Sequence, residues 1–418
     1  MQQFSMQSFI NSTKPANNNQ YNVSSNQAVK IPDNSLKQDT FELSSEKKVE
    51  NNPKNKASLK EKILTGLGIG TAIATAAFLI YKNKTSKLHQ LPKHIDFAQA
   101  KTYEEAIEFG NKVLKIENYE GFTSADLDVL NWINEGMVNM SNMHKGKLRI
   151  PKNVRYTNLD PSILAAMCNK ADSPNFGRFT VNKNAFDDID KTLAKFLDFH
   201  NKTASKGIKI GKVQCQLENP EIQQLIDLYT QNKATYNQKV QLLTYIIEEN
   251  NTFNTIKESS AYYINYLLQN NVITSADIGG ITFEELLKKP IKEQRKVLVD
   301  VVQKINDEKH MTIKFAVKKS SPFSTVYHEF GHLQDMVLRT PAMGKYTNPN
   351  DYPKELLDWL NDPRKMQIAN CVSSYATTGP GEFIAEVFAS RANGNMINPD
   401  VEKLYYELGG PKLPKPIK

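Results

Sequence analysis

The pattern of polar and apolar residues divides the chain into a polar arm, an apolar run and a long globular part. Residues 1–60 are rich in Asn, Ser, Gln and Lys and contain few large apolar side chains. Such a segment cannot bury enough apolar surface to offset the entropy of the chain. We therefore predict that residues 1–60 form a disordered N-terminal arm.

Residues 63–81 contain no charged side chain, and lysines flank the run on both sides. A helix of this length nearly matches the roughly 30 Å hydrocarbon core of a bilayer. We predict a transmembrane helix over residues 61–82, a linker over residues 83–100 and hence a single-pass membrane protein. The spacing Gly66-x-x-x-Gly70 would let two such helices pair in a homodimer. The alternative is a helix of small residues packed inside the soluble fold.

Hydrophobic periods typical of helices and strands alternate over residues 101–217, the N-terminal part of the soluble domain. A capped helix begins at Thr102-x-x-Glu105. The pattern predicts further helices over residues 123–140, 163–167 and 185–200, and strands over residues 154–156, 179–181 and 208–217.

Residues 218–306 are mostly helical by the same criteria and form a helical insertion, with a second capped start at Thr282-x-x-Glu285. Residues 307–418 follow as the catalytic part. Here the pattern predicts a strand over residues 311–317 and a helix from Ser324 or Thr325 to about Leu338. The fold class that we predict is α+β, mostly helical with a small mixed sheet.

Composition narrows the classes of function. The net charge of +8 is spread along the 418 residues, and no nucleic-acid-binding motif accompanies it, so we expect no nucleic acid partner. The 3 cysteines, Cys168, Cys215 and Cys371, are far apart and form no C-x-x-C pair. They predict neither a disulfide framework nor a zinc knuckle.

The five residues His328-Glu329-Phe330-Gly331-His332 form an H-E-x-x-H motif. On a helix, positions i and i+4 share one face, so both imidazoles can reach one metal ion. Glu329 would then face the water on that ion and could take its proton. Two histidines suit Zn²⁺, which needs one more protein ligand and an open position for catalysis.

A third ligand is predicted fifty residues further on. Gly379-Pro380-Gly381 reads as a turn, and Glu382 opens a short amphipathic helix that also carries Glu386. Two carboxylates four residues apart repel each other unless cations lie opposite. A zinc ion and a zinc-bound histidine would supply these cations, with Glu382 on the metal and Glu386 on the second ring nitrogen of a histidine.

Together with Tyr375, these residues resemble the family of zincin metallopeptidases that includes the catalytic domain of anthrax lethal factor and the Pro-Pro endopeptidases. The resemblance covers residues 309–395. It implies a zincin-like fold and a zinc endopeptidase. Its site residues would be His328, His332 and Glu382 as metal ligands, Glu329 as general base, Tyr375 as the phenol that stabilises the oxyanion, and Glu386 as the carboxylate behind the ligands.

Each motif also has a plain structural reading. The H-E-x-x-H spacing can be an accident of a helix surface, Tyr375 a core tyrosine and Glu386 a solvated helix residue. We predict a membrane-anchored zinc endopeptidase with one Zn²⁺ per chain. Its expected partners are a protein or peptide substrate, a membrane through residues 63–81 and a second copy of the chain. The alternative is a catalytically inactive zincin-fold scaffold or binding protein tethered to a membrane.

Overall fold

The computed structural model describes most of the chain from His89 onward. The described residues are 89–160, 163–168, 173, 175–202, 207–258, 260–269, 271–309, 314–335, 337 and 339–415. The predicted disordered arm over residues 1–60 and the predicted helix over residues 61–82 lie outside them.

The prediction of a single-pass membrane protein is corrected. Within the described residues, no helix is both long and apolar enough to cross a bilayer. The two longest, α8 (Tyr236–Glu258) and α11 (Ile291–Lys309), carry several charged side chains each. One such side chain at the bilayer centre costs roughly 2.5–3.5 kcal/mol. We therefore withdraw the predicted membrane contact of residues 63–81 and the predicted pairing of two such helices.

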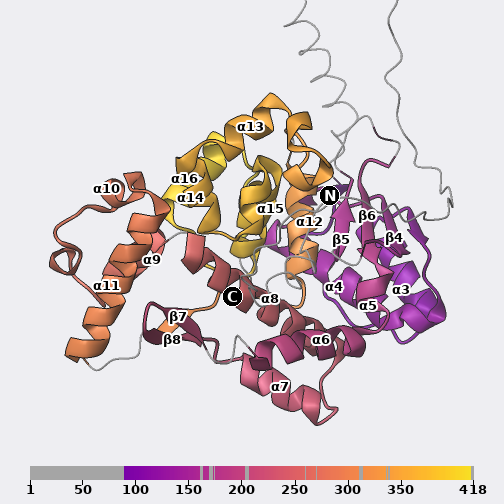
Figure 1. Ribbon diagram of the computed structural model, residues 1–418. Coiled ribbons are helices and arrows are strands. Elements are labelled where there is room, and N and C mark those ends of the chain that lie inside the picture. The colour runs from indigo at the N-terminus through magenta and orange to yellow at the C-terminus, as the bar shows by residue number, and fades with distance from the viewer. Residues whose placement is uncertain are drawn as a thin grey trace, which may run out of the picture. The chain divides into compact units, whose positions relative to one another are not determined.

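A small mixed sheet lies beside the predicted site (Figure 1). Its strand order is β2-β4-β6-β5, with the first three strands parallel and the last antiparallel. The strands span β2 (Asn118–Glu120), β4 (Asn153–Thr157), β6 (Arg178–Asn182) and β5 (Ala165–Met167). This sheet and the mostly helical content agree with the predicted class.

Strand β5 corrects one element of the prediction, because residues 163–167 were expected to be helical. Ala165 pairs with Val181 and Met167 with Phe179 in an antiparallel register. All three residues of β5 are buried. A short, continuous apolar run has no periodicity that distinguishes a buried strand from a buried helix. Here the pairing with β6 determines that residues 165–167 form a strand.

Helices cover this sheet and form with it the largest of the three hydrophobic cores that the described residues make. The long helix α4 (Leu127–Met143) contributes Leu130, Trp132 and Ile133, which are completely buried. The other elements around it are α3 (Tyr103–Phe109), η1 (Gly110–Leu114), η2 (Ser124–Asp126), α5 (Lys183–Phe186), α6 (Ile189–Lys202), α7 (Ile222–Thr230) and α8. The predicted helix over residues 185–200 is thus two helices, with a break after Phe186.

The second half of the predicted linker over residues 83–100 packs against this core. Strand β1 (His89–Gln90) pairs with β3 (Lys147–Leu148). Ile95 is buried, and its backbone N–H and C=O both bond the side-chain amide of Asn142 on α4. Residues 89–100 are therefore part of the folded domain.

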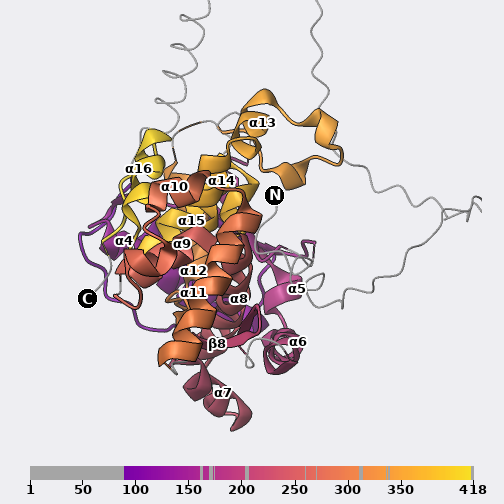
Figure 2. The same ribbon diagram turned by 60° about the vertical axis from the view of Figure 1, so that its left-hand side comes forward.

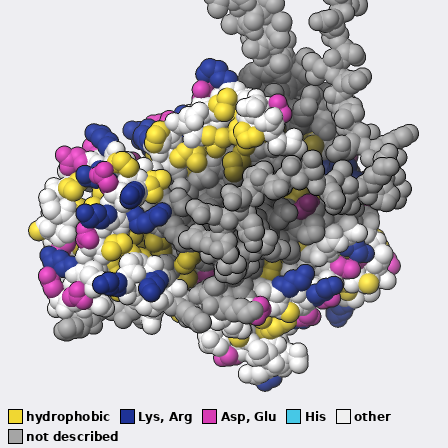
Figure 3. All heavy atoms as spheres, viewed as in Figure 1, with side chains coloured by type: hydrophobic (Ala, Val, Ile, Leu, Met, Phe, Trp, Pro, Cys, Tyr) yellow, Lys and Arg dark blue, Asp and Glu magenta, His cyan; other side chains and the backbone are white. Residues whose placement is uncertain are grey.

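A second core belongs to the region that was predicted as a helical insertion. Strands β7 (Ile208–Ile210), β8 (Val213–Glu218) and β9 (Lys314–Ala316) form a separate sheet in this order. Helices α9 (Ser260–Gln269), α10 (Phe283–Lys288) and α11 pack with it, together with η4 (Ser275–Ile278), and Figure 2 turns these helices toward the viewer. Charged side chains of both signs are interspersed over their surface (Figure 3).

The C-terminal part supplies the third core and most of the predicted site. It consists of α12 (Ser324–Gln334), η5 (Met343–Lys345), η6 (Pro349–Asp351), α13 (Lys354–Leu360), α14 (Pro363–Asn370), η7 (Tyr375–Thr378), α15 (Pro380–Ala392) and α16 (Pro399–Glu407). Helix α12 lies between α15 and strand β5 and contacts both (Figure 1). This arrangement puts the H-E-x-x-H motif at the edge of the sheet.

Candidate metal centre

The candidate centre lies where α12 and α15 pack side by side. Gly331, inside the H-E-x-x-H motif, is at the closest approach. A Cβ atom on Gly331 would lie 2.8 Å from the Cα of Ala385 and 3.2 Å from the Cβ of Phe388. A backbone atom cannot move aside as a flexible side chain can, so a larger residue would force the helices apart. The glycine therefore brings the motif within reach of the carboxylates on α15.

Three ligand-type side chains converge from these two helices. Glu382 Oε2 lies 3.3 Å from His328 Nε2 and 3.0 Å from His332 Nε2. These distances match the separation of about 3.3 Å between ligand atoms that each lie about 2.0–2.1 Å from one tetrahedral ion. The three side chains are only 3%, 13% and 12% exposed for His328, His332 and Glu382. The group could hold a metal ion.

Glu386 fixes the orientation of the His328 ring. The Nδ1 atom of His328 lies 2.7 Å from Glu386 Oε1, one helical turn beyond Glu382 on α15. A carboxylate that accepts the Nδ1–H sets the tautomer in which Nε2 carries the free lone pair. Ser373 donates a further hydrogen bond to Glu386. His328 Nε2 is thereby turned toward Glu382 and His332.

The imidazoles and carboxylates stabilise one another's charged forms. Burial alone would lower the pKa of His328, but its hydrogen bonds with Glu382 and Glu386 raise that pKa well above its ordinary value. Burial likewise opposes ionisation of Glu382, yet the charge of His332 and hydrogen bonds from both histidines lower the pKa of this carboxyl. A metal ion that binds here therefore competes with a proton on His328.

Glu329 is buried beside the three ligand-type residues and is tied to the edge of the sheet. The backbone N–H of Met167 on β5 donates a hydrogen bond to its carboxylate. Burial raises the pKa of Glu329, although the charges of His328 and His332 oppose the shift. A carboxyl with a raised pKa can take up and return a proton closer to neutral pH than an ordinary one.

Tyr375 reaches the site from η7. Its ring centroid lies 5.7 Å from that of His328. The Oη atom is buried and has no hydrogen bond of normal geometry among the described residues, only an approach to Glu382. Burial and the charges of Glu382 and Glu329 raise the pKa of Tyr375 well above its ordinary value, so the phenol keeps its proton. Because buried hydroxyls normally have partners, this Oη–H is a donor available to a ligand.

Helix α12 ends at Gln334, four residues before the predicted end at Leu338. The side-chain amide of Gln334 bonds the backbone of Arg149 in both directions, at 2.9 and 3.0 Å. The next residue, Asp335, is extended and forms a buried ion pair with Arg339. The helix predicted from the apolar period therefore ends earlier than expected, and Asp335 leaves it in an extended conformation.

The structure brings the six predicted site residues together: His328, Glu329, His332, Tyr375, Glu382 and Glu386. Gly381, predicted as part of a turn, is the second residue of α15 instead. His200 lies outside this group and pairs with Glu249 at 2.6 Å between α6 and α8. All three cysteines are free thiols.

Sequence reasoning missed three further residues around the centre: Met167, Glu248 and Lys318. Met167 was assigned to a helix, so the backbone N–H that it presents at the edge of the sheet was not expected. Glu248 lies on α8, some eighty residues before the motif, and Lys318 is one of many lysines. No local signal distinguishes either of them; only the tertiary fold brings them together.

Comparison with known proteins identifies no relative: no family model, no curated protein and no solved structure matches this chain. The resemblance to zincin metallopeptidases therefore depends on the motif residues alone.

Proposed function

We propose that this protein is a zinc-dependent endopeptidase. The observation that carries the proposal is the convergence of two imidazoles and one carboxylate, with Glu329 and Tyr375 beside them. Two histidines and one glutamate are a ligand set of zinc hydrolases, which leaves a coordination position open. The three ligand atoms lie close enough together to hold one metal ion, and imidazole nitrogen with carboxylate oxygen is a donor set that suits zinc.

His328 and His332 through Nε2, and Glu382 through its carboxylate, would hold the zinc. When bound, the ion would polarise the scissile carbonyl and lower the pKa of a water molecule. Glu386 would keep the His328 ring in its metal-binding tautomer throughout the reaction. The hydrogen bond from Met167 would keep Glu329 oriented at the edge of the sheet.

The remaining chemistry falls to two side chains. Glu329 would remove the proton from the attacking water and deliver it to the leaving amine. The Oη–H of Tyr375 would donate to the carbonyl oxygen as negative charge develops there. Such a donor is worth most when it is buried and already in place, because no reorganisation is needed during the reaction.

A metal assay and a cleavage assay on the full-length protein test the proposal. We expect one zinc per chain, and cleavage of a proteome-derived peptide library that mass spectrometry detects. Glu329→Gln should keep the zinc and slow cleavage by roughly 10²–10⁴-fold, since an amide cannot accept the proton. Zinc without any cleavage would support a non-catalytic metal-binding protein, and absence of zinc would refute the site.

A further inference from the structure

A line of polar contacts, the polar seam, runs along the interface between α12 and α15, and one of its contacts lies outside the metal centre. Ser324, His328 and His332 are spaced four residues apart, so they share one face of α12. The seam consists of Ser324 with Asn393, His328 with Glu386 and His332 with Glu382. The two helices are therefore antiparallel, since contacts that come later on α12 come earlier on α15.

Asn393 is the C-cap residue of α15, and both ends of its side-chain amide hold the start of α12. The amide nitrogen donates to the hydroxyl of Ser324, the first residue of α12, at 2.9 Å. The amide oxygen accepts from the hydroxyl of Ser321 at 2.8 Å. The hydroxyl of Ser324 donates in turn to the backbone C=O of Ser321 at 2.9 Å. These hydrogen bonds join the end of one helix to the start of the other.

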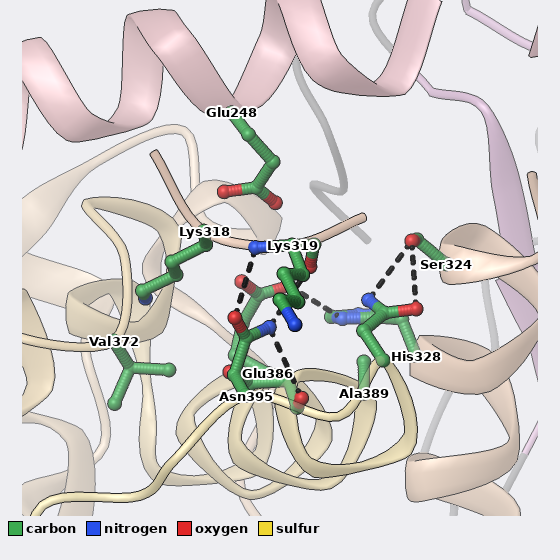
Figure 4. A pocket seen from close by; sticks show the side chains of 11 residues that line it. Glu248, Lys318, Lys319, Ser324, His328, Val372, Glu386, Ala389 and Asn395 are labelled. Carbon is green, nitrogen blue, oxygen red and sulfur yellow. Dashed lines mark hydrogen bonds and ion pairs between the residues drawn. The ribbon is translucent and has the colours of Figure 1, made fainter. Parts of the chain in front are cut away.

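Ser324 and Asn393 line a small cavity of about 20 Å³ behind His328, which Glu248 and Lys318 also line. Figure 4 shows Ser324 at one side of this cavity, next to His328, with two of its hydrogen bonds dashed. The Ser324 residue is only 4% exposed. Because breaking a buried hydrogen bond leaves a polar group unpaired, this contact resists displacement of the helix.

The chain that leads into α12 is anchored at two further points. The side-chain amide of Asn395 accepts from the N–H of Lys319 at 2.9 Å and donates to its C=O at 2.8 Å. From α4, the indole N–H of Trp132 donates to the C=O of Pro322 at 2.7 Å. The start of α12 is thus held both by the C-terminal end of α15 and by α4.

The axial register of α12 against α15 needs a contact of this kind. Gly331 lies directly against the backbone of Ala385. A glycine inserts no side chain between the ridges of the other helix, so this contact sets the spacing of the helices and resists sliding only weakly. The contacts of Glu382 with both histidines would be replaced by bonds to the ion in the proposed zinc-bound state. Ser324 and Asn393 neither titrate nor belong to the ligand set, so their contact serves both states.

We propose that Asn393 is a positioning residue of the metal centre: by holding Ser324 and Ser321, it fixes the axial register that brings His328 and His332 to Glu382. The inference rests on the metal site of the proposed function and deepens it. Ligand groups must be held within about 0.5 Å of their productive positions. One residue of helix rises about 1.5 Å, so a slip of much less than one residue already disturbs the site.

The test measures the Zn²⁺ affinity of Asn393→Ala in the full-length protein by competition with a chelator. Loss of a group that orients a ligand lowers metal affinity by about 10–100-fold, and we expect about tenfold for Asn393→Ala. The matched control is Asn398→Ala, because Asn398 caps α16 by accepting from the N–H of Asp400 at 2.8 Å. It should lower the midpoint of denaturant unfolding about as much as Asn393→Ala and leave the Zn²⁺ affinity unchanged.

The visible spectrum of the Co²⁺-loaded protein adds a readout of ligand geometry that overall stability does not move. The spectrum should change in Asn393→Ala and stay the same in Asn398→Ala. Ser324→Ala removes the partner hydroxyl with little change in size, and it replaces Asn393→Ala if that variant does not fold. Because both changes remove one shared contact, the double variant should lose less than about twofold in affinity beyond Asn393→Ala.

The possible outcomes separate the two proposals. A wild-type protein that binds no Zn²⁺ refutes the metal site itself. A wild-type protein that binds Zn²⁺, with unchanged affinity and Co²⁺ spectrum in folded Asn393→Ala, refutes only the role of Asn393. An equal loss of affinity in Asn393→Ala and Asn398→Ala would show general destabilisation and overturn the positioning role. Losses from Asn393→Ala and Ser324→Ala that simply add would overturn the action through Ser324.

Discussion

The α12–α15 pair and the α9–α11 group are both helical, yet they are held together in different ways. In the α12–α15 pair, a glycine brings two backbones into contact, and buried ionisable groups lie between them. In the α9–α11 group, an apolar core is surrounded by exposed ion pairs, such as Lys304 with Asp277 at 2.9 Å. Capping boxes at Thr274 and Thr282 begin two of its short helices.

The two regions differ in whether their polar groups are buried or exposed, and therefore in the free energy that is needed to place those groups there. A buried carboxylate is tolerated only with a partner, so each group in the α12–α15 pair depends on several others. Exposed ion pairs and caps in the α9–α11 group contribute locally and nearly independently. A single substitution between α12 and α15 should therefore affect both metal binding and catalysis. The effect of a substitution in the α9–α11 group should be confined to the helix that carries it.

The largest effect is expected from His332→Ala. Loss of a direct ligand should lower zinc affinity by more than the roughly 100-fold seen for outer partners. Hydrogen exchange of α9–α11 should remain unchanged, since none of the site residues belongs to the core of these helices. Metal analysis and exchange mass spectrometry measure both, with the exposed His94→Ala as the control. Full zinc occupancy in His332→Ala would exclude this residue from the ligand set.

Tyr375→Phe tests whether the α12–α15 region contributes to catalysis separately from metal binding. The change removes one oxyanion donor and should slow turnover by roughly 10²-fold while zinc content stays at the wild-type level. Single-turnover cleavage of an identified peptide measures the rate. A wild-type rate in this variant would mean that Tyr375 is only a core residue.

Gly331→Ala tests the close approach of the helices. The added methyl group meets the Ala385 backbone, and overpacking of this kind costs about 1–3 kcal/mol. We expect a lower midpoint of denaturant unfolding and weaker zinc binding. Gly381→Ala is the matched control, because its Cβ would be 3.6 Å from the nearest Arg339 atom, an ordinary contact. Equal stability of both variants would contradict a tight interface at Gly331.

The smallest effect is expected from Thr282→Ala, on the other side of the comparison. The Thr282 hydroxyl accepts a hydrogen bond from the backbone N–H of Glu285 at 3.2 Å. Loss of a cap should lower hydrogen-exchange protection in α10 by about fivefold. Zinc content and cleavage should not change. A loss of activity in this variant would show that the two regions are coupled.

Signals that are local in sequence were predicted well. Thr102 and Thr282 cap helices as expected, because a cap depends on residues within one turn. Glu382 and Glu386 lie on one face of α15, as their spacing requires. A contact of Glu386 with one of the motif histidines was also expected, since two neighbouring carboxylates need a cation opposite them, and the structure shows that the partner is His328.

Features that depend on distant pairing were not predicted. Met167 belongs to a strand because β6 lies beside it, and its own run of apolar residues does not indicate this. Helix α12 ends at Gln334, whose side chain bonds the backbone of Arg149, 185 residues earlier, and no pattern near residue 334 indicates this contact. The cavity behind His328 depends on Glu248 and Lys318, seventy residues apart, so composition alone could not predict it.

Two indole contacts give the centre an optical reporter. Trp132 and Trp359 are the 2 tryptophans of the chain, and both are buried. Trp132 donates to the C=O of Pro322 just before α12, and Trp359 to that of Thr377 just before α15. Their emission therefore comes from the two walls of the metal site, and the α9–α11 group contributes none. Quenching by Co²⁺ or Cu²⁺ would follow loading of the site in the unlabelled, unmodified protein.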